Sequence, residues 1–188
     1  MLRLGYGRGA RLGCALSEAF FQEIAPFFLK NYFMPNSEFR QRERVIEVAR
    51  SWLGTPYHPM GRIKKVGVDC LTLLAEVYHE AGVIERVDVP YYPQDWHLHR
   101  GQERYQNGLL RYAREINTLP LPSDIALWKF GRCMSHGAIV IEWPVIIHAY
   151  VGRACVLENA EAATWLTCIG ENANGQGKAR MVRFFSVW

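Results

Sequence analysis

Cys70 stands at the predicted start of a helix, directly after a residue that favours helix N-termini. Asp69 is a good N-cap, and Gly82 predicts the end of the helix. Between them apolar residues repeat at helical spacing: Leu71, Leu74, Ala75, Tyr78 and Ala81. A thiol in the first helical turn lies beside unpaired N–H groups and the positive end of the helix dipole, which favour the thiolate. We therefore predict that the pKa of Cys70 is lowered and that Cys70 is a nucleophile, although for a cysteine chosen at random simple packing is the commoner role.

Two histidines lie on predicted neighbouring strands further along the chain. Residues 135–141 and 145–150 favour strands, with Glu142-Trp143-Pro144 as the turn between them. The resulting hairpin sets His136 and His148 on adjacent strands, although the sequence leaves open the register that would make them face each other. A nucleophilic thiol needs a base, and the base needs a third group that orients its ring. With Cys70, the two histidines supply such a set.

These residues resemble a known family. Residues 53–57 read Leu-Gly-Thr-Pro-Tyr, the pair Asp69-Cys70 opens the helix, and Ile147-His148-Ala149 lies on the second strand. Together they resemble the NlpC-type cell-wall cysteine peptidases, which have a papain-like fold and cut the peptide stems of bacterial peptidoglycan. The match runs from about Arg44 to the C-terminus.

The resemblance implies a role for each matching residue. Cys70 would be the nucleophile, His136 the general base and acid, and His148 the residue that orients His136. The substrate-binding or oxyanion side of the site would include Tyr57, Asp69 and the backbone N–H of Cys70. Acylation of Cys70 and hydrolysis of the thioester need no cofactor and no metal.

One departure from the family pattern points to a particular branch. The cell-wall hydrolases usually read D-C-S-G, whereas this chain reads Asp69-Cys70-Leu71-Thr72. In the family, the serine after the cysteine helps to hold the amino end of the substrate. This chain has Leu71 at that position, so we expect recognition of that end to differ. The D-C-L form, with an insert such as residues 89–99, resembles the branch of tailed phages, prophages and gene transfer agents. That resemblance implies a virion component that opens the cell wall during DNA delivery, with tail hub or tail-tip proteins as partners.

The order of the predicted elements gives an α+β class. Helices are expected near residues 39–53 and 70–81, with a third marked by Tyr105, Leu109, Tyr112 and Ile116. Strands are expected near 125–130, 136–142, 145–151, 154–158 and 180–187. Helices that precede a run of antiparallel strands are typical of α+β proteins. We expect a papain-like, NlpC-type fold in which the helices pack on an antiparallel sheet or small barrel. The turn Pro122-Ser123-Asp124 resembles the family's P-G-D turn, with Ser123 in place of glycine.

The predicted domain spans residues 37–188, after an N-terminal extension over residues 1–36. The extension carries an aromatic segment from Phe20 to Phe33 that could dock on this domain or on a tail protein, and Met34 could be an internal start. The extension lacks the pattern of a signal peptide, so we expect synthesis in the cytoplasm and delivery to the periplasm or cell wall of a host by a particle.

Composition disfavours several other classes of protein. The net charge of +4 comes without a dense Lys/Arg run, so nothing argues for nucleic acid as a partner. Five cysteines without C-x-x-C spacing disfavour a zinc site or a disulfide scaffold, and His97 with His99 is a weak metal motif. No apolar run is long enough to span a membrane. Two alternatives stay open: a catalytically idle structural module of a tail, and a papain-like amidase or acyltransferase on another substrate.

Overall fold

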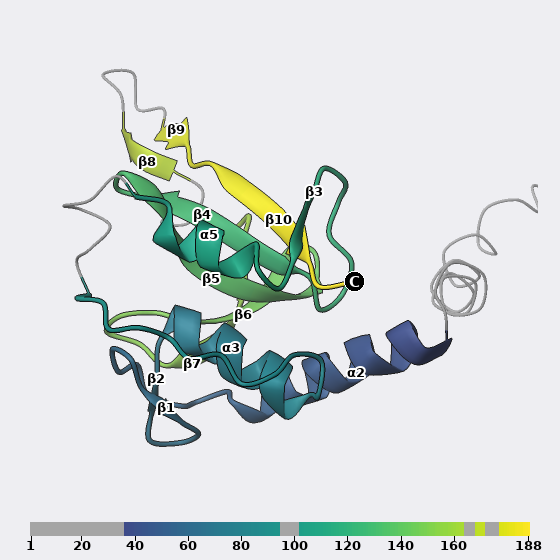
Figure 1. Ribbon diagram of the computed structural model, residues 1–188. Coiled ribbons are helices and arrows are strands. Elements are labelled where there is room, and N and C mark those ends of the chain that lie inside the picture. The colour runs from purple at the N-terminus through teal and green to yellow at the C-terminus, as the bar shows by residue number, and fades with distance from the viewer. Residues whose placement is uncertain (1–35, 95–101, 164–167, 172–176) are drawn as a thin grey trace, which may run out of the picture. The chain divides into compact units, whose positions relative to one another are not determined.

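A computed structural model describes residues 36–94, 102–163, 168–171 and 177–188 (Figure 1). The predicted extension over residues 1–36 lies outside the described residues except for Asn36, and so do Met34, the aromatic segment 20–33, His97 and His99. The domain boundary and the docking role of the extension therefore stay predictions.

An antiparallel sheet with helices earlier in the chain confirms the expected α+β class. The helices of the described residues are α2 (Asn36–Ser51), α3 (Cys70–Glu80) and α5 (Arg104–Leu109). Over the described residues the main sheet has six strands in the order β3-β10-β4-β5-β6-β7 (Figure 1). Their bounds are β3 Arg114–Ile116, β4 Ile125–Phe130, β5 Cys133–Glu142, β6 Val145–Ala149, β7 Cys155–Asn159 and β10 Val182–Ser186. Two small antiparallel pairs complete the described strands: β1 (Arg62–Ile63) with β2 (Gly67–Val68), and β8 (Cys168–Glu171) with β9 (Gly177–Ala179).

Helix α3 begins and ends where its local sequence predicts. The Asp69 carboxylate accepts hydrogen bonds from the backbone N–H groups of Leu71 and Thr72, and the Thr72 hydroxyl accepts one from the Asp69 N–H. This reciprocal pair is a capping box, which satisfies N–H groups that a helix leaves unpaired at its start. Gly82 follows the helix with φ +73°, a left-handed conformation that favours glycine. Cys70 is therefore held in the first helical turn.

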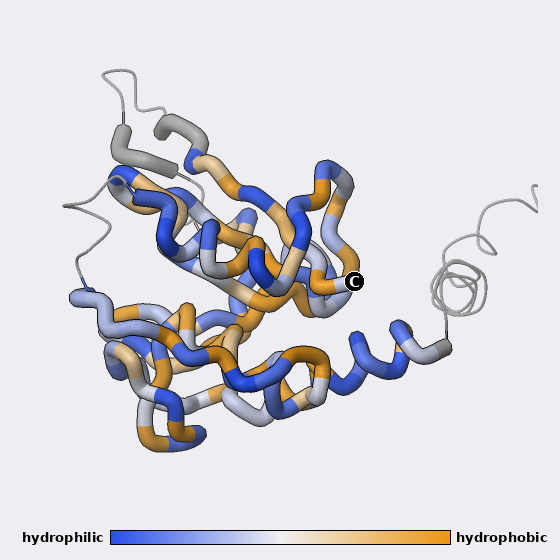
Figure 2. The backbone as a smooth tube through the Cα atoms, viewed as in Figure 1, coloured by the Kyte–Doolittle hydropathy of each residue, from blue (hydrophilic) through white to orange (hydrophobic). Residues whose placement is uncertain are grey.

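Apolar side chains cover both faces of the central strands. Leu127, Ile139 and Ile147 belong to one core cluster with the buried face of α3, whereas the alternate residues Ala126, Val140 and Ile146 belong to a second cluster. Strands buried on both faces carry nearly continuous apolar runs, as β5 does. Figure 2 shows the contrast between the mostly hydrophilic helix α2 and the more apolar strands of the sheet.

Glycine at position 137 lets α3 and α5 approach strand β5 closely. A methyl group added at Gly137 would collide with the Tyr105 hydroxyl and would lie 2.9 Å from Cδ1 of Leu74. Helix α3 carries Leu74, α5 carries Tyr105, and both helices contact β5. This close approach places the start of α3 next to the strand that carries His136.

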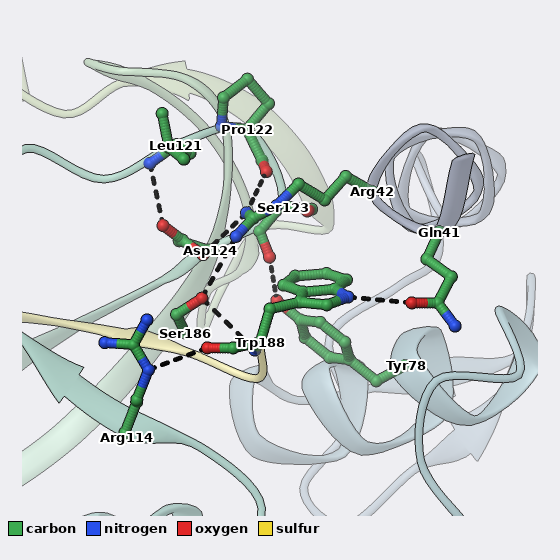
Figure 3. Close-up of polar contacts among 10 residues, drawn as sticks. All are labelled: Gln41, Arg42, Tyr78, Arg114, Leu121, Pro122, Ser123, Asp124, Ser186 and Trp188. Carbon is green, nitrogen blue, oxygen red and sulfur yellow. Dashed lines mark hydrogen bonds and ion pairs between the residues drawn. The ribbon is translucent and has the colours of Figure 1, made fainter. Parts of the chain in front are cut away.

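A buried ion pair joins α2 to the turn before β4 (Figure 3). Nη1 of Arg42 lies 2.9 Å from Oδ1 of Asp124 and also donates to the carbonyl oxygen of Pro122. Nη2 of Arg42 donates to the Ser186 hydroxyl at the end of β10, and the guanidinium lies 4.1 Å from the centre of the Trp188 ring. Because both charged side chains are buried, removing one partner alone would leave an uncompensated charge inside the protein.

Two predicted segments differ from the structure. The third helix was expected to extend to Ile116, but α5 ends at Leu109, and Ile116 pairs with Phe184 as part of β3. The long-range pairing with β10 therefore overrides the helical periodicity of this short segment. Residues 168–171 and 177–179 were not among the predicted strands, but they form the paired strands β8 and β9.

The turn before β4 contains a strained residue. Ser123 has φ +68°, the left-handed region that favours glycine. Its hydroxyl is buried and has no hydrogen-bond partner among the described residues. Ser123 therefore carries both a backbone strain and an unsatisfied polar group.

We predict that Ser123→Gly stabilises the protein by about 1 kcal/mol, because the relief of strain and the loss of a buried hydroxyl outweigh the extra freedom of glycine in the unfolded chain. Urea denaturation monitored by fluorescence measures the change. The matched variant Ser123→Ala loses the hydroxyl but keeps the strained backbone, so it should gain less. A destabilised Ser123→Gly variant would contradict the assignment of strain.

Candidate active site

Cys70 and His136 line one cavity of about 150 Å³. Cys70 is the first residue of α3, and His136 lies within β5. The wall of the cavity also includes Tyr57, Asp69, Leu71, Tyr92, Tyr105 and Tyr150. His148 on β6 has 0% exposure, and its ring is hydrogen-bonded to the ring of His136. The structure thus brings together the predicted nucleophile, base and orienting residue.

The thiol is held against the strand of the histidine. Sγ of Cys70 donates to the carbonyl oxygen of Ser135 at 3.8 Å, and Ser135 directly precedes His136. The Tyr105 hydroxyl donates to the carbonyl oxygen of Cys70 at 3.1 Å. Cys70 is partly exposed as a residue and lines the cavity.

The register of the hairpin places the two histidines on one face of the sheet. Strands β5 and β6 pair Ile139 with Ile147, so continuing the register puts His136 diagonally across from His148. Nε2 of His136 lies 2.9 Å from Nδ1 of His148, and the two rings are nearly perpendicular, at 87°. This contact supplies the geometry that the predicted orienting role of His148 requires.

Burial keeps both imidazoles neutral near pH 7. Burial, followed by the charges of His148 and Arg180, lowers the pKa of His136 well below its usual value. The pKa of His148 is also lowered by burial, although its hydrogen bond to Glu158 acts in the opposite direction. A neutral imidazole can accept a proton, so His136 is in the form that a general base requires.

The predicted direction of the Cys70 pKa is wrong for the free protein. Burial, and then the negative charge of Asp69, raise the pKa of the Cys70 thiol to about 12. Backbone N–H groups of Gly137, Cys70 and Leu71 lower the pKa, but by less. The helix start predicted from the sequence is present, yet the carboxylate that caps the helix opposes a second negative charge beside it. The resting site therefore holds a thiol and a neutral imidazole.

Tyr57 and Asp69 line the same cavity as Cys70. Burial raises the pKa of Tyr57, so Tyr57 keeps its phenolic proton at neutral pH. The second carboxylate oxygen of Asp69 accepts hydrogen bonds from the Met60 N–H and the Tyr92 hydroxyl. Asp69 is therefore already bonded through both oxygens.

Sequence reasoning missed three residues of the site. Tyr92 belongs to the insert noted above, but nothing in its spacing indicates that its hydroxyl reaches Asp69. Tyr105 was placed on a helix and not in the site. Glu158 on β7 lies 3.0 Å from Nε2 of His148, a contact that only the pairing of β6 with β7 reveals.

The described residues offer no metal centre and no membrane span. No group of three or more His, Cys, Asp or Glu side chains among them could hold a metal ion. Within the same part of the chain, no helix is long and apolar enough to cross a bilayer.

Comparison with known proteins finds likeness only at the level of structure. No family model matches the chain, and no curated protein sequence matches it. The NlpC/p60 domain of the peptidoglycan hydrolase SagA is 18% identical with a TM-score of 0.47, over 64% of this chain and 90% of that domain. An NLP/P60-family protein from Staphylococcus aureus is 18% identical with a TM-score of 0.48, over 78% of this chain and 45% of its own length.

RipD from Mycobacterium tuberculosis, described as a non-catalytic NlpC/p60 domain protein adapted to peptidoglycan binding, is 14% identical. Its TM-score is 0.48, over 79% of this chain and 98% of RipD. At TM-scores below 0.5 and identities below 20%, these likenesses leave the chemistry of the chain to be decided by its own residues.

We predict that Asp69→Asn lowers the pKa of Cys70, because it removes a negative charge beside the sulfur and asparagine can still cap α3. Iodoacetamide labelling followed across pH by peptide mass spectrometry measures this pKa. Cys70 of the unaltered protein should label slowly at pH 7 and faster as the pH rises, whereas the variant should reach the same rate at lower pH. Fast labelling of the unaltered protein at pH 6 would show that the thiolate is stabilised after all.

Proposed function

We propose that the chain is an NlpC-type cysteine peptidase with a papain-like fold that hydrolyses amide bonds in peptidoglycan stem peptides. The observation that carries this proposal is the arrangement of Cys70 and His136 in one cavity, with His148 bonded to His136 at 2.9 Å. The motifs around Tyr57, Asp69 and His148 support the choice of substrate by their resemblance to the family. On that resemblance, the proposed bond joins D-glutamate to diaminopimelate.

The proposed reaction needs only groups of the chain and water. His136 takes the proton of the Cys70 thiol as the sulfur attacks the amide carbonyl, and the backbone N–H of Cys70 helps to stabilise the oxyanion. The protonated His136 then gives its proton to the leaving amine, which leaves a thioester on Cys70. Water activated by His136 hydrolyses the thioester and releases the acid. Proton transfer has to accompany the attack, because the free protein holds a neutral thiol.

The wall of the cavity supports a proposal for the form of the substrate. Leu71 lines the cavity where the family pattern has a serine. The Asp69 carboxylate is already bonded to backbone N–H groups and to Tyr92, so it has little capacity to bind an amino group. We therefore propose that the site accepts stems within intact or cross-linked wall in preference to free stem peptides with a charged amino end.

We predict that Cys70→Ala abolishes hydrolysis of purified murein, because the nucleophile is lost. His148→Ala should reduce turnover less, since nucleophile and base remain while the orientation of His136 is lost. Cys133→Ala is the matched control, because Cys133 is a buried cysteine outside the cavity and should retain full activity. Mass spectrometry of the released fragments identifies the cleaved bond.

The same assay run on free stem peptides separates the two forms of the substrate. Faster cleavage of intact wall is expected. A strong preference for free stem peptides would reverse the substrate proposal, and equal loss in Cys70→Ala and His148→Ala would show that His148 does more than orient the base.

Two alternatives each have an observation in their favour. The raised pKa of Cys70 suits a catalytically idle structural module, which would give no products from any substrate. An apolar cavity of about 250 Å³ shares Leu71, Tyr92 and Tyr105 with the candidate site, which suits an amidase or acyltransferase acting on a lipid. Labelling of Cys70 by an acyl thioester donor, in the absence of murein hydrolysis, would favour the acyltransferase.

We further propose that the protein is a component of a phage-type or gene-transfer-agent tail. The Asp69-Cys70-Leu71 form and the insert over residues 89–99 support this proposal by resemblance. The protein would be made in the cytoplasm and carried by the particle to the periplasm and cell wall of the next cell. The aromatic segment 20–33 is the proposed dock on a tail hub or tail-tip protein, because aromatic side chains dominate many protein interfaces.

We predict that deletion of residues 1–34 prevents incorporation into purified particles while murein hydrolysis by the soluble protein is largely retained. Immunoblots of particles from strains with full-length and truncated protein measure incorporation. Normal incorporation of the truncated protein would remove the docking role from this segment. Absence of the full-length protein from particles would contradict the tail proposal itself.

A further inference from the structure

Glu158 ends a continuous chain of polar side chains that starts in the candidate site. Strands β6 and β7 pair Ile146 with Glu158 and His148 with Val156, so Glu158 lies diagonally across from His148 on the same face. Oε2 of Glu158 lies 3.0 Å from Nε2 of His148. The chain therefore runs from His136 through His148 to Glu158, with contacts of 2.9 and 3.0 Å.

The acceptor at the end of this chain decides where each ring proton resides. A carboxylate only accepts hydrogen bonds, so Nε2 of His148 has to carry a proton and donate it to Glu158. In a neutral imidazole the other nitrogen then bears a lone pair, so Nδ1 of His148 accepts. The 2.9 Å contact therefore requires Nε2 of His136 to be the donor. The remaining nitrogen of His136, Nδ1, is left as the basic one.

Arg153 holds the carboxylate in place. Its Nη1 lies 3.2 Å from Oε1 and 3.5 Å from Oε2 of Glu158. His148 has no solvent exposure, so water cannot replace Glu158 as the acceptor without a rearrangement of the core. Glu158 itself retains about one fifth of its side-chain exposure, which lets it connect a buried ring to the surface arginine.

We propose that Glu158 is a positioning residue that fixes the tautomers of His148 and His136 and so leaves Nδ1 of His136 as the general base. Nε2 of His136 is hydrogen-bonded to His148, so the proton of the Cys70 thiol has to be accepted by Nδ1 of His136. Without an acceptor at position 158, the proton shared by the two rings can reside on either side. The catalytic consequence rests on the proposed peptidase function, whereas the assignment of tautomers does not.

Ring ¹⁵N chemical shifts of the full chain labelled with ¹⁵N-histidine test the proposal directly. Histidine nitrogens with and without a proton have well-separated shifts, and His136→Gln and His148→Gln variants assign the signals. In the unaltered protein both rings should carry the proton on Nε2 and none on Nδ1. A protonated Nδ1 on His136 would overturn the proposal without the use of any variant at position 158.

Two variants and a control then test the role of the carboxylate. Glu158→Leu removes the acceptor and should give His136 a detectable Nδ1–H population and lower kcat on murein at least about 10-fold, with little change in KM. Glu158→Gln retains an oxygen acceptor of the same length and should restore most of the Nε2–H tautomer and of kcat. The matched control Glu161→Gln, at an exposed glutamate in the following turn, should match the unaltered protein.

The outcomes distinguish this proposal from the proposed function. Unchanged tautomers in Glu158→Leu would overturn the positioning role. The expected tautomers in a protein that releases no fragments from murein would leave the positioning role intact and contradict the peptidase proposal.

Discussion

The candidate site depends on the hydrogen bonds that the Asp69 carboxylate accepts. It caps α3 through Leu71 and Thr72, and it binds the Met60 N–H and the Tyr92 hydroxyl from two other segments. One side chain therefore sets the start of the helix and joins it to the loops that wall the cavity. The same negative charge opposes ionisation of the neighbouring Cys70. The residue that positions the proposed nucleophile therefore also opposes its ionisation.

The sheet carries the two histidines of the candidate site, whereas the helix start carries the cysteine. Strands β5, β6 and β7 stand side by side and carry His136, His148 and Glu158 on one face, so a polar chain crosses an otherwise apolar layer. Each ring in the chain finds a partner, which is the condition for burying polar groups without a large loss of stability. Burial also keeps the imidazoles neutral, so His136 is in the form that can accept a proton.

Much of the fold could be predicted because its signals are local. The Asp69 cap, the apolar repeat of α3 and Gly82 define that helix, and the turn at Glu142-Trp143-Pro144 defines the hairpin of β5 and β6. Strand β3 could not be predicted, since residues 114–116 form a strand only through pairing with β10. The docking role of the N-terminal extension and the identity of a tail partner depend on more than local sequence signals. Both stay predictions.

The sequence by itself determined the three central residues of the candidate site, because Cys70, His136 and His148 each stand at a recognisable place on a helix or strand. Tertiary structure alone decided how they act. A shift of one residue in strand register would turn His148 to the other face, and no local pattern sets that register. The high pKa of Cys70 and the contact of Glu158 with His148 likewise depend on burial and on charges far apart in the chain, which exist only once the strands and helices have packed.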